Sequence, residues 1–140
     1  MNTQAQYAAT ILRIAVGAMF LSHGLLKLLV FTLPGTAGFF ASVGFPGALA
    51  YVVTFAEIGG GLLLIAGIFV REVNLALIPI LLGALVVHWS AGWVFSNANG
   101  GWEYPAFLVA ASIASALLGP GKFALSLPLP GKSAAEPEAA

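Results

Sequence analysis

The chain has 140 residues, of which 60% are hydrophobic and only 7% are charged, and its net charge is zero. A soluble domain needs about 25% charged residues to wet its surface, so this composition excludes one and predicts a protein embedded in a lipid bilayer. The zero net charge argues against nucleic acid as a partner, and the absence of cysteine excludes disulfides, thiol redox chemistry and thiolate metal sites.

Four apolar windows come close to the roughly 20 residues that a membrane-spanning helix needs. In chain order they cover residues 8–31, 47–70, 73–95 and 102–118. The first is too long for the apolar part of a signal peptide and has no Lys or Arg before it, so we expect it to be retained. We therefore predict an all-α integral membrane protein whose residues 1–127 form a four-transmembrane-helix bundle.

The segments between these windows carry turn signals. Residues 34–46 are expected to form an outer loop or a short interfacial helix, and the third window ends at a loop rich in Asn and Gly. Arg71 and Glu72 are expected to end the second window, and Pro79 lies inside the third, where neighbouring helices must satisfy the carbonyl that it frees. The small, acidic residues of the tail predict that 128–140 are disordered and cytoplasmic.

The basic residues predict the orientation in the membrane. With four spans, one side holds four of them and the other side only Lys27; the four are Arg13, Arg71, Lys122 and Lys132. Positive charge accumulates on the cytoplasmic side, so we expect both termini in the cytoplasm of an inner-membrane protein. The aromatic residues of the opposite side, which fit an interfacial belt, are Trp89, Trp93, Trp102 and Tyr104.

Most ionisable side chains within the windows fall in the outer half of the bilayer. At about 1.5 Å per residue, His23 and His88 lie about 10–12 Å below the outer helix ends, Lys27 about 6 Å and Glu57 about 15 Å, while Glu103 lies at the mouth. Charges in a bilayer turn inward and find partners, and they lean towards functional roles. These five residues are therefore the candidates for ligand binding or proton exchange.

Two helix faces are predicted to carry this site. His23 and Lys27 are four residues apart and share a face of the first helix. Gly60 and Gly61 lie beside Glu57 on the second, so a neighbouring helix can approach closely there and bring a cation to the carboxylate. The candidates for that cation are His23, Lys27 and Arg13, and Arg13, alone in the inner half, is expected to form a structural ion pair.

From about Ala9 to Leu127 the sequence resembles the DoxX family of small four-helix membrane proteins. Five segments carry the resemblance: Arg13–Gly17, Phe20–Leu28, Gly38–Pro46, Glu57–Gly67 and Gly101–Pro105, with His88 and Gly119–Lys122 beside them. The family takes its name from subunits of a thiosulfate:quinone oxidoreductase. The resemblance thus implies a subunit that faces quinone or a redox partner protein, although a chain without cysteine performs no thiol step itself.

The leading hypothesis is a membrane subunit that binds a quinone near its outer face. His23, Glu57 and His88 would exchange protons or hydrogen bonds with it, while Lys27 and Glu103 would tune the mouth electrostatically. The alternative is a non-enzymatic scaffold that docks a partner protein, with the polar residues only holding the helices together. Further readings are a transporter, a haem between His23 and His88, or a metal site made by the histidines with Glu57 and Glu103. The sequence leaves open the substrate, the electron donor and the oligomeric state.

Overall fold

The structure is a computed structural model that describes residues 1–125, and in this part of the chain it contains helices and no strand. Three helices are long and apolar enough to cross a membrane, namely Thr3–Val30, Leu49–Ala66 and Val70–Ala91. The remaining apolar helix, α5 (Glu103–Leu118), is shorter. The helical fold is thereby confirmed, and the length and composition of these helices are compatible with the predicted membrane bundle. The tail predicted to be disordered lies outside the described residues.

The first span begins earlier than the hydropathy window. Helix α1 (Thr3–Leu25) starts five residues before Ala8, because the Asn2 side chain accepts a hydrogen bond from the Ala5 amide and caps the helix. It continues without a break into a π-helical segment, η1 (Leu26–Val30). Thr32 then caps the short helix α2 (Leu33–Ser42), which occupies the stretch predicted as a loop or interfacial helix.

The second span is shorter than its window. Helix α3 (Leu49–Ala66) ends because Gly67 takes a left-handed conformation (φ +81°) and its amide donates to the carbonyl of Leu64. Helix α4 (Val70–His88) begins three residues later, so Arg71 and Glu72 lie in its first turn instead of ending the second span.

The third span runs helically through Pro79 and ends before the predicted Phe95. After His88 the chain makes one 3₁₀ turn, η2 (Trp89–Ala91), and then enters a loop. Gly92 has a positive φ there, and its carbonyl accepts a hydrogen bond from the Trp102 amide across the loop. These bonds make a compact connection between α4 and α5.

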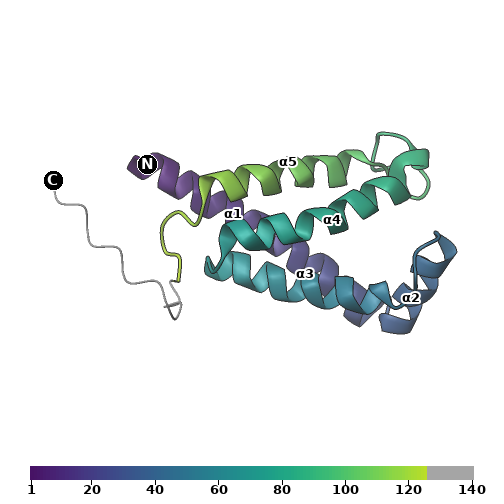
Figure 1. The fold of residues 1–140 in the computed structure, drawn as a ribbon. Helices are drawn as coiled ribbons and strands as arrows, with labels where there is room; N and C mark the ends of the chain where they lie inside the picture. Colours follow the sequence, from purple (N-terminus) through teal and green to yellow (C-terminus); the bar gives the residue numbers. More distant parts are fainter. Residues whose placement is uncertain (126–140) are drawn as a thin grey trace.

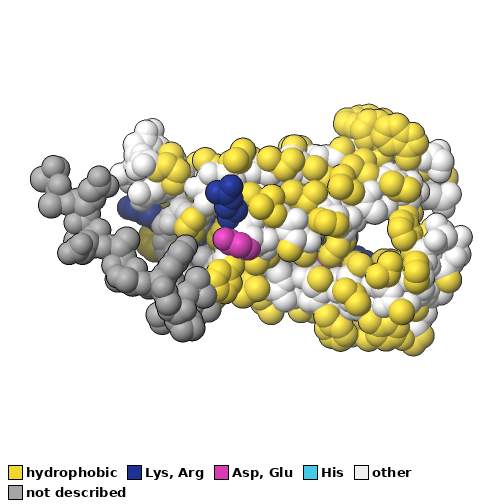
Figure 2. Space-filling model, in the orientation of Figure 1, with side chains coloured by type: hydrophobic (Ala, Val, Ile, Leu, Met, Phe, Trp, Pro, Cys, Tyr) yellow, Lys and Arg dark blue, Asp and Glu magenta, His cyan; other side chains and the backbone are white. Residues whose placement is uncertain are grey.

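The helices pack as two pairs, α1 on α3 and α4 on α5, with a smaller contact between α3 and α4 (Figure 1). The buried core draws on all four and consists of Val16, Phe20, Leu64, Val70, Leu77, Leu81, Leu108 and Ala111. Hydrophobic side chains, with uncharged atoms between them, occupy much of the visible surface between the two ends of the molecule (Figure 2). This surface is what a lipid environment requires.

Candidate functional site

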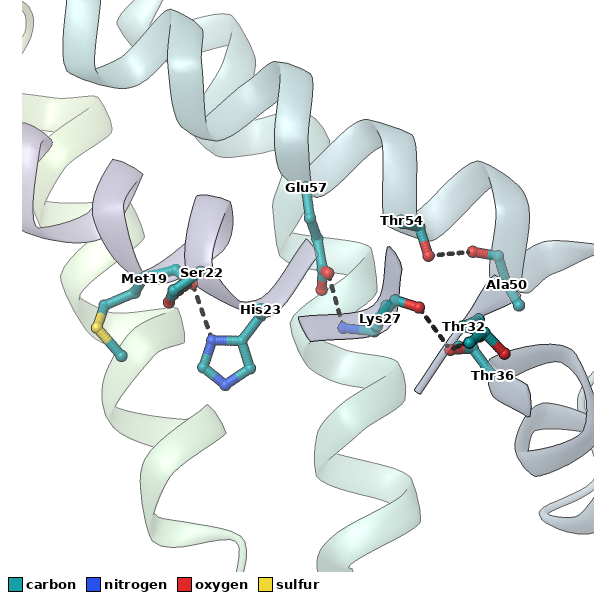
Figure 3. Close-up of polar contacts among 9 residues, drawn as sticks. All are labelled: Met19, Ser22, His23, Lys27, Thr32, Thr36, Ala50, Thr54 and Glu57. Carbon is teal, nitrogen blue, oxygen red and sulfur yellow. Dashed lines mark hydrogen bonds and ion pairs between the residues drawn. The ribbon is translucent and has the colours of Figure 1, made fainter. Parts of the chain in front are cut away.

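A buried ion pair joins the first span to α3. The Nζ atom of Lys27 lies 2.7 Å from Oε2 of Glu57, and the two side chains are only 18% and 7% exposed. Glu57 extends from α3 towards Lys27, and His23 lies about one turn before Lys27 on the same span (Figure 3). Of the three cations considered for Glu57, the structure thus selects Lys27.

The π-helical segment carries Lys27 to this position. Lys27 is the second residue of η1, at the point where the α-helical spacing of α1 changes. Its carbonyl also receives a hydrogen bond from the hydroxyl of Thr36, 3.3 Å away at the start of α2. Short π segments are rare and occur often at functional sites, so the local geometry agrees with the choice of this residue.

His23 lies beside an aromatic ring of α5. Its Nδ1 atom is 2.8 Å from the carbonyl oxygen of Met19, and because a carbonyl only accepts, Nδ1 carries the proton and Nε2 is the acceptor of the neutral ring. The imidazole stacks on Tyr104, with ring centroids 5.5 Å apart. The Tyr104 hydroxyl oxygen is buried and has no hydrogen-bond partner within residues 1–125. A buried donor without a partner is costly, so this hydroxyl calls for a ligand or water.

A cavity of about 560 Å³ opens at the N-terminal end of α5. It is lined by Trp93, Phe95, Glu103, Tyr104, Ala106 and Phe107, so its wall is mainly aromatic with one carboxylate. Figure 2 also shows an opening near this end of the molecule, with hydrophobic side chains around it and atoms of a basic side chain at its edge. Tyr104 belongs both to the cavity wall and to the stack with His23.

His88 and Glu103 make their polar contacts in the loop between α4 and α5. Nδ1 of His88 lies 3.0 Å from the carbonyl oxygen of Asn99. The carboxylate of Glu103 accepts a hydrogen bond of 2.8 Å from the Phe95 amide. The five candidates therefore do not share one set of contacts, because two of them hold the loop while His23, Lys27 and Glu57 lie at the contacts between spans.

Arg13 makes no ion pair within the described residues. The residue is 1% exposed, and its guanidinium instead donates to four backbone carbonyls. Nη1 lies 2.9 and 2.5 Å from the oxygens of Leu64 and Ile65, Nε lies 2.7 Å from that of Pro120, and Nη2 lies 3.1 Å from that of Lys122. The last carbonyls of a helix have no partner within it and carry partial negative charge, so the end of α3 attracts this cation where no carboxylate is at hand.

Two features of the interior are not predicted from the sequence. The aromatic pattern predicts Tyr104 as part of the interfacial belt, although its place next to Glu103 at the start of the last apolar helix is a signal for a site residue. The second feature is a group of three buried polar residues on α4 and α5, namely Asn74, Ser112 and Ser115. They are uncharged and lie in apolar stretches of the sequence, where only the asparagine indicates a polar side chain in the interior.

The structure also bears on the metal hypothesis. Within residues 1–125, no group of three or more His, Asp or Glu side chains lies close enough together to hold a metal ion. This agrees with the separation of His88 and Glu103 from Glu57 described above.

Comparison with known proteins adds an independent line of argument. The model of a family described as DoxX matches residues 8–89. The chain is also similar to a protein of Bacillus subtilis (strain 168) named "Putative oxidoreductase CatD", with 33% identity over 119 residues, which are 85% of this chain and 84% of that protein. No solved structure matches the chain.

Proposed function

The chain belongs to the DoxX family, and from this premise we propose that it is a quinone-interacting membrane subunit of a redox complex. The name of its B. subtilis relative contains the word oxidoreductase, which supports a redox role. Family membership and the apolar helices indicate a multi-pass membrane protein. We further propose that α5 is a fourth span and that both termini face the cytoplasm.

The observation that carries the proposal is Tyr104, which lines an aromatic cavity and whose buried hydroxyl has no partner among residues 1–125. Quinone carbonyls accept hydrogen bonds, and a phenol hydroxyl donates one. The aromatic wall suits a flat, apolar ring, and the exposed faces of Trp93 and Phe107 would let a lipophilic molecule enter from the bilayer. The residues present therefore fit such a ligand.

The neighbouring titratable groups suit the protons that accompany quinone reduction. The His23 ring stacks on Tyr104, and its Nε2 can accept a proton as the ring becomes cationic. Glu103 lines the same cavity and would set its charge. Lys27 and Glu57 form an ion pair between the first span and α3. Because the two charges cancel, the pair would add no net charge near His23. Electrons would come from a partner subunit, since this chain has no thiol.

A fluorescence titration tests the proposal. Trp93 lines the cavity, so a short-chain ubiquinone analogue that binds there should quench tryptophan emission of the purified protein in detergent. Tyr104→Phe removes only the hydroxyl and should weaken binding about tenfold, as the loss of one hydrogen bond implies. Tyr51→Phe, at an exposed tyrosine of α3, is the matched control and should bind as the wild type does. The absence of quenching at micromolar analogue, or equal affinities for both variants, would refute the proposal.

The scaffold reading has one observation in its favour. The Nδ1 atoms of His23 and His88 and the carboxylate of Glu103 all bond to backbone groups, which is how polar side chains hold a fold together. If this reading holds, Glu57→Gln will lower the melting temperature without changing the affinity for any quinone analogue. A variant that loses both at the same time would favour the ligand site instead.

A further inference from the structure

A second polar cluster lies in the core between α4 and α5, in the inner half of the molecule. It consists of Asn74 on α4 and of Ser112 and Ser115 on α5, and all three side chains are 0% exposed. Asn74 is four residues into α4, about 6 Å along the axis from its inner end. The cluster is thus separate from the cavity at the N-terminal end of α5, and none of its residues lines that cavity.

The hydrogen bonds of this cluster leave specific atoms unsatisfied. Nδ2 of Asn74 donates to the carbonyl of Val70, 2.8 Å away, and to Oγ of Ser115, 3.1 Å away, which uses both of its hydrogens. The Asn74 Oδ1 and the Ser112 Oγ are buried without any partner within residues 1–125. Because Ser115 acts as an acceptor, its own hydrogen is not used in that bond.

These unpaired atoms cannot find a hydrogen-bond partner in bulk water. In a soluble protein they could turn towards solvent, but here lipid surrounds the helix pair. The Ser112 hydroxyl could have bonded to a carbonyl of its own helix, as the Thr54 hydroxyl does on α3 with Ala50 at 2.7 Å. It makes no such bond. The atoms left over are an amide oxygen, which only accepts, and two hydroxyls, which can donate.

We propose that the α4–α5 pair holds an ordered water molecule at this cluster. The water would donate to Oδ1 of Asn74 and accept from the hydroxyls of Ser112 and Ser115, which are three residues apart and share a helix face. Three hydrogen bonds are typical of buried water. All three partners are neutral, which suits water and not a cation. The proposal is independent of the quinone site, because it uses different residues at the other end of α5.

Hydroxyl-radical footprinting with synchrotron X-rays tests the proposal on the full chain in detergent. Radicals formed from a bound water modify the side chains around it even where bulk solvent has no access. Leu77 lies three residues after Asn74 and is buried, so it should be modified; Phe20, which is equally buried and more reactive, is the internal control. The ratio of Leu77 to Phe20 modification should fall at least severalfold in Ser112→Ala. An unmodified Leu77, or a ratio unchanged by the substitution, would overturn the proposal.

Thermal unfolding supplies a second readout. If the site is dry, Ser112→Ala removes an unpaired hydroxyl and should raise the melting temperature. If water is bound, the same change removes one of its partners and should lower the melting temperature by about 2–4 °C. Ser22→Ala, at an exposed serine of α1, corrects for the higher helix propensity of alanine. A melting temperature for Ser112→Ala at or above that of Ser22→Ala would contradict the bound water.

Discussion

At the scale of single residues, Lys27 and Glu57 illustrate how two buried charges depend on each other. Both leave water on folding, and their mutual attraction and hydrogen bond offset the lost hydration only while both are present. Removing one of the two charges therefore leaves the other buried without a partner, whereas removing both charges leaves no unpaired charge in the interior. This difference distinguishes the cost of breaking the pair from its net contribution.

Glu57→Gln should lower the free energy of unfolding by about 3–5 kcal/mol, since the ammonium of Lys27 remains buried without its carboxylate. The double variant Lys27→Met with Glu57→Gln should regain most of this loss. Denaturant titration in mixed micelles measures both, and Glu72→Gln, at an exposed glutamate of α4, is the control. Equal stabilities for Glu57→Gln and wild type would show that the pair is not buried as described.

Arg13 depends on the shape of its side chain as well as on its charge. Arg13→Lys keeps the charge, but an ammonium has three hydrogens on one atom and cannot reach four carbonyls that surround a planar fork. We expect a loss of about 2–3 kcal/mol, since hydrogen bonds from charged donors are among the stronger ones. The same titration measures it, with Arg71→Lys at an exposed position as the control. A loss as small as that of the control would contradict the role of the four carbonyls.

At the scale of helices, close packing explains why α1 and α3 make the most extensive contact. A Cβ atom added at Gly61 would lie 2.6 Å from the backbone nitrogen of Leu21 and 2.7 Å from the carbonyl oxygen of Gly17. These are backbone atoms and cannot move without separating the helices. Glycines at such positions let helices approach in membranes, where packing takes the place of the hydrophobic effect.

Gly61→Ala should therefore destabilise the protein by about 1–3 kcal/mol, the usual cost of overpacking, and should also weaken the ion pair that depends on this approach. Gly59→Ala is a matched control two residues away, because an added Cβ there meets no atom within 4 Å. It should be neutral or slightly stabilising, as alanine favours a helix. The two melting temperatures in detergent decide the matter, and similar values would mean that the α1–α3 contact is looser than described.

The same scale shows what the sequence could predict. Hydropathy predicts the long helices, and depth along them selects Lys27 and Glu57, whose side chains form an ion pair in the structure. Helix ends are harder to predict from the sequence. The cap at Asn2 and the left-handed Gly67 depend on local backbone geometry, and a hydropathy average over many residues does not detect it. Depth alone also placed His88 near His23, but it does not give the direction of a side chain, and His88 turns to the loop carbonyl of Asn99.

At the scale of the whole molecule, the chain returns to one end after α5. The amide of Lys122 donates to the carbonyl of Gln6, and that of Leu125 to the carbonyl of Ala66. The segment after α5 thus lies against the start of α1 and the end of α3. Because α5 starts where the loop after α4 ends and is followed by this segment, α5 runs back between the same two ends as α4. This arrangement supports the proposal of four spans in spite of the short α5.

Thiol labelling of single-cysteine variants tests that topology directly, because the natural chain has no cysteine and each variant carries one reactive group. Ser42→Cys and Ala98→Cys are at exposed positions of the end predicted to face outward. Gln4→Cys and Leu125→Cys are at exposed positions of the opposite end. In intact cells a membrane-impermeant maleimide should label Ser42→Cys and Ala98→Cys. It should label Gln4→Cys and Leu125→Cys only after the membrane is permeabilised. Labelling of Leu125→Cys from outside would mean that α5 does not span. Labelling of Gln4→Cys with it would mean that the whole orientation is inverted, because the basic residues predicted to be cytoplasmic would then face away from the cytoplasm.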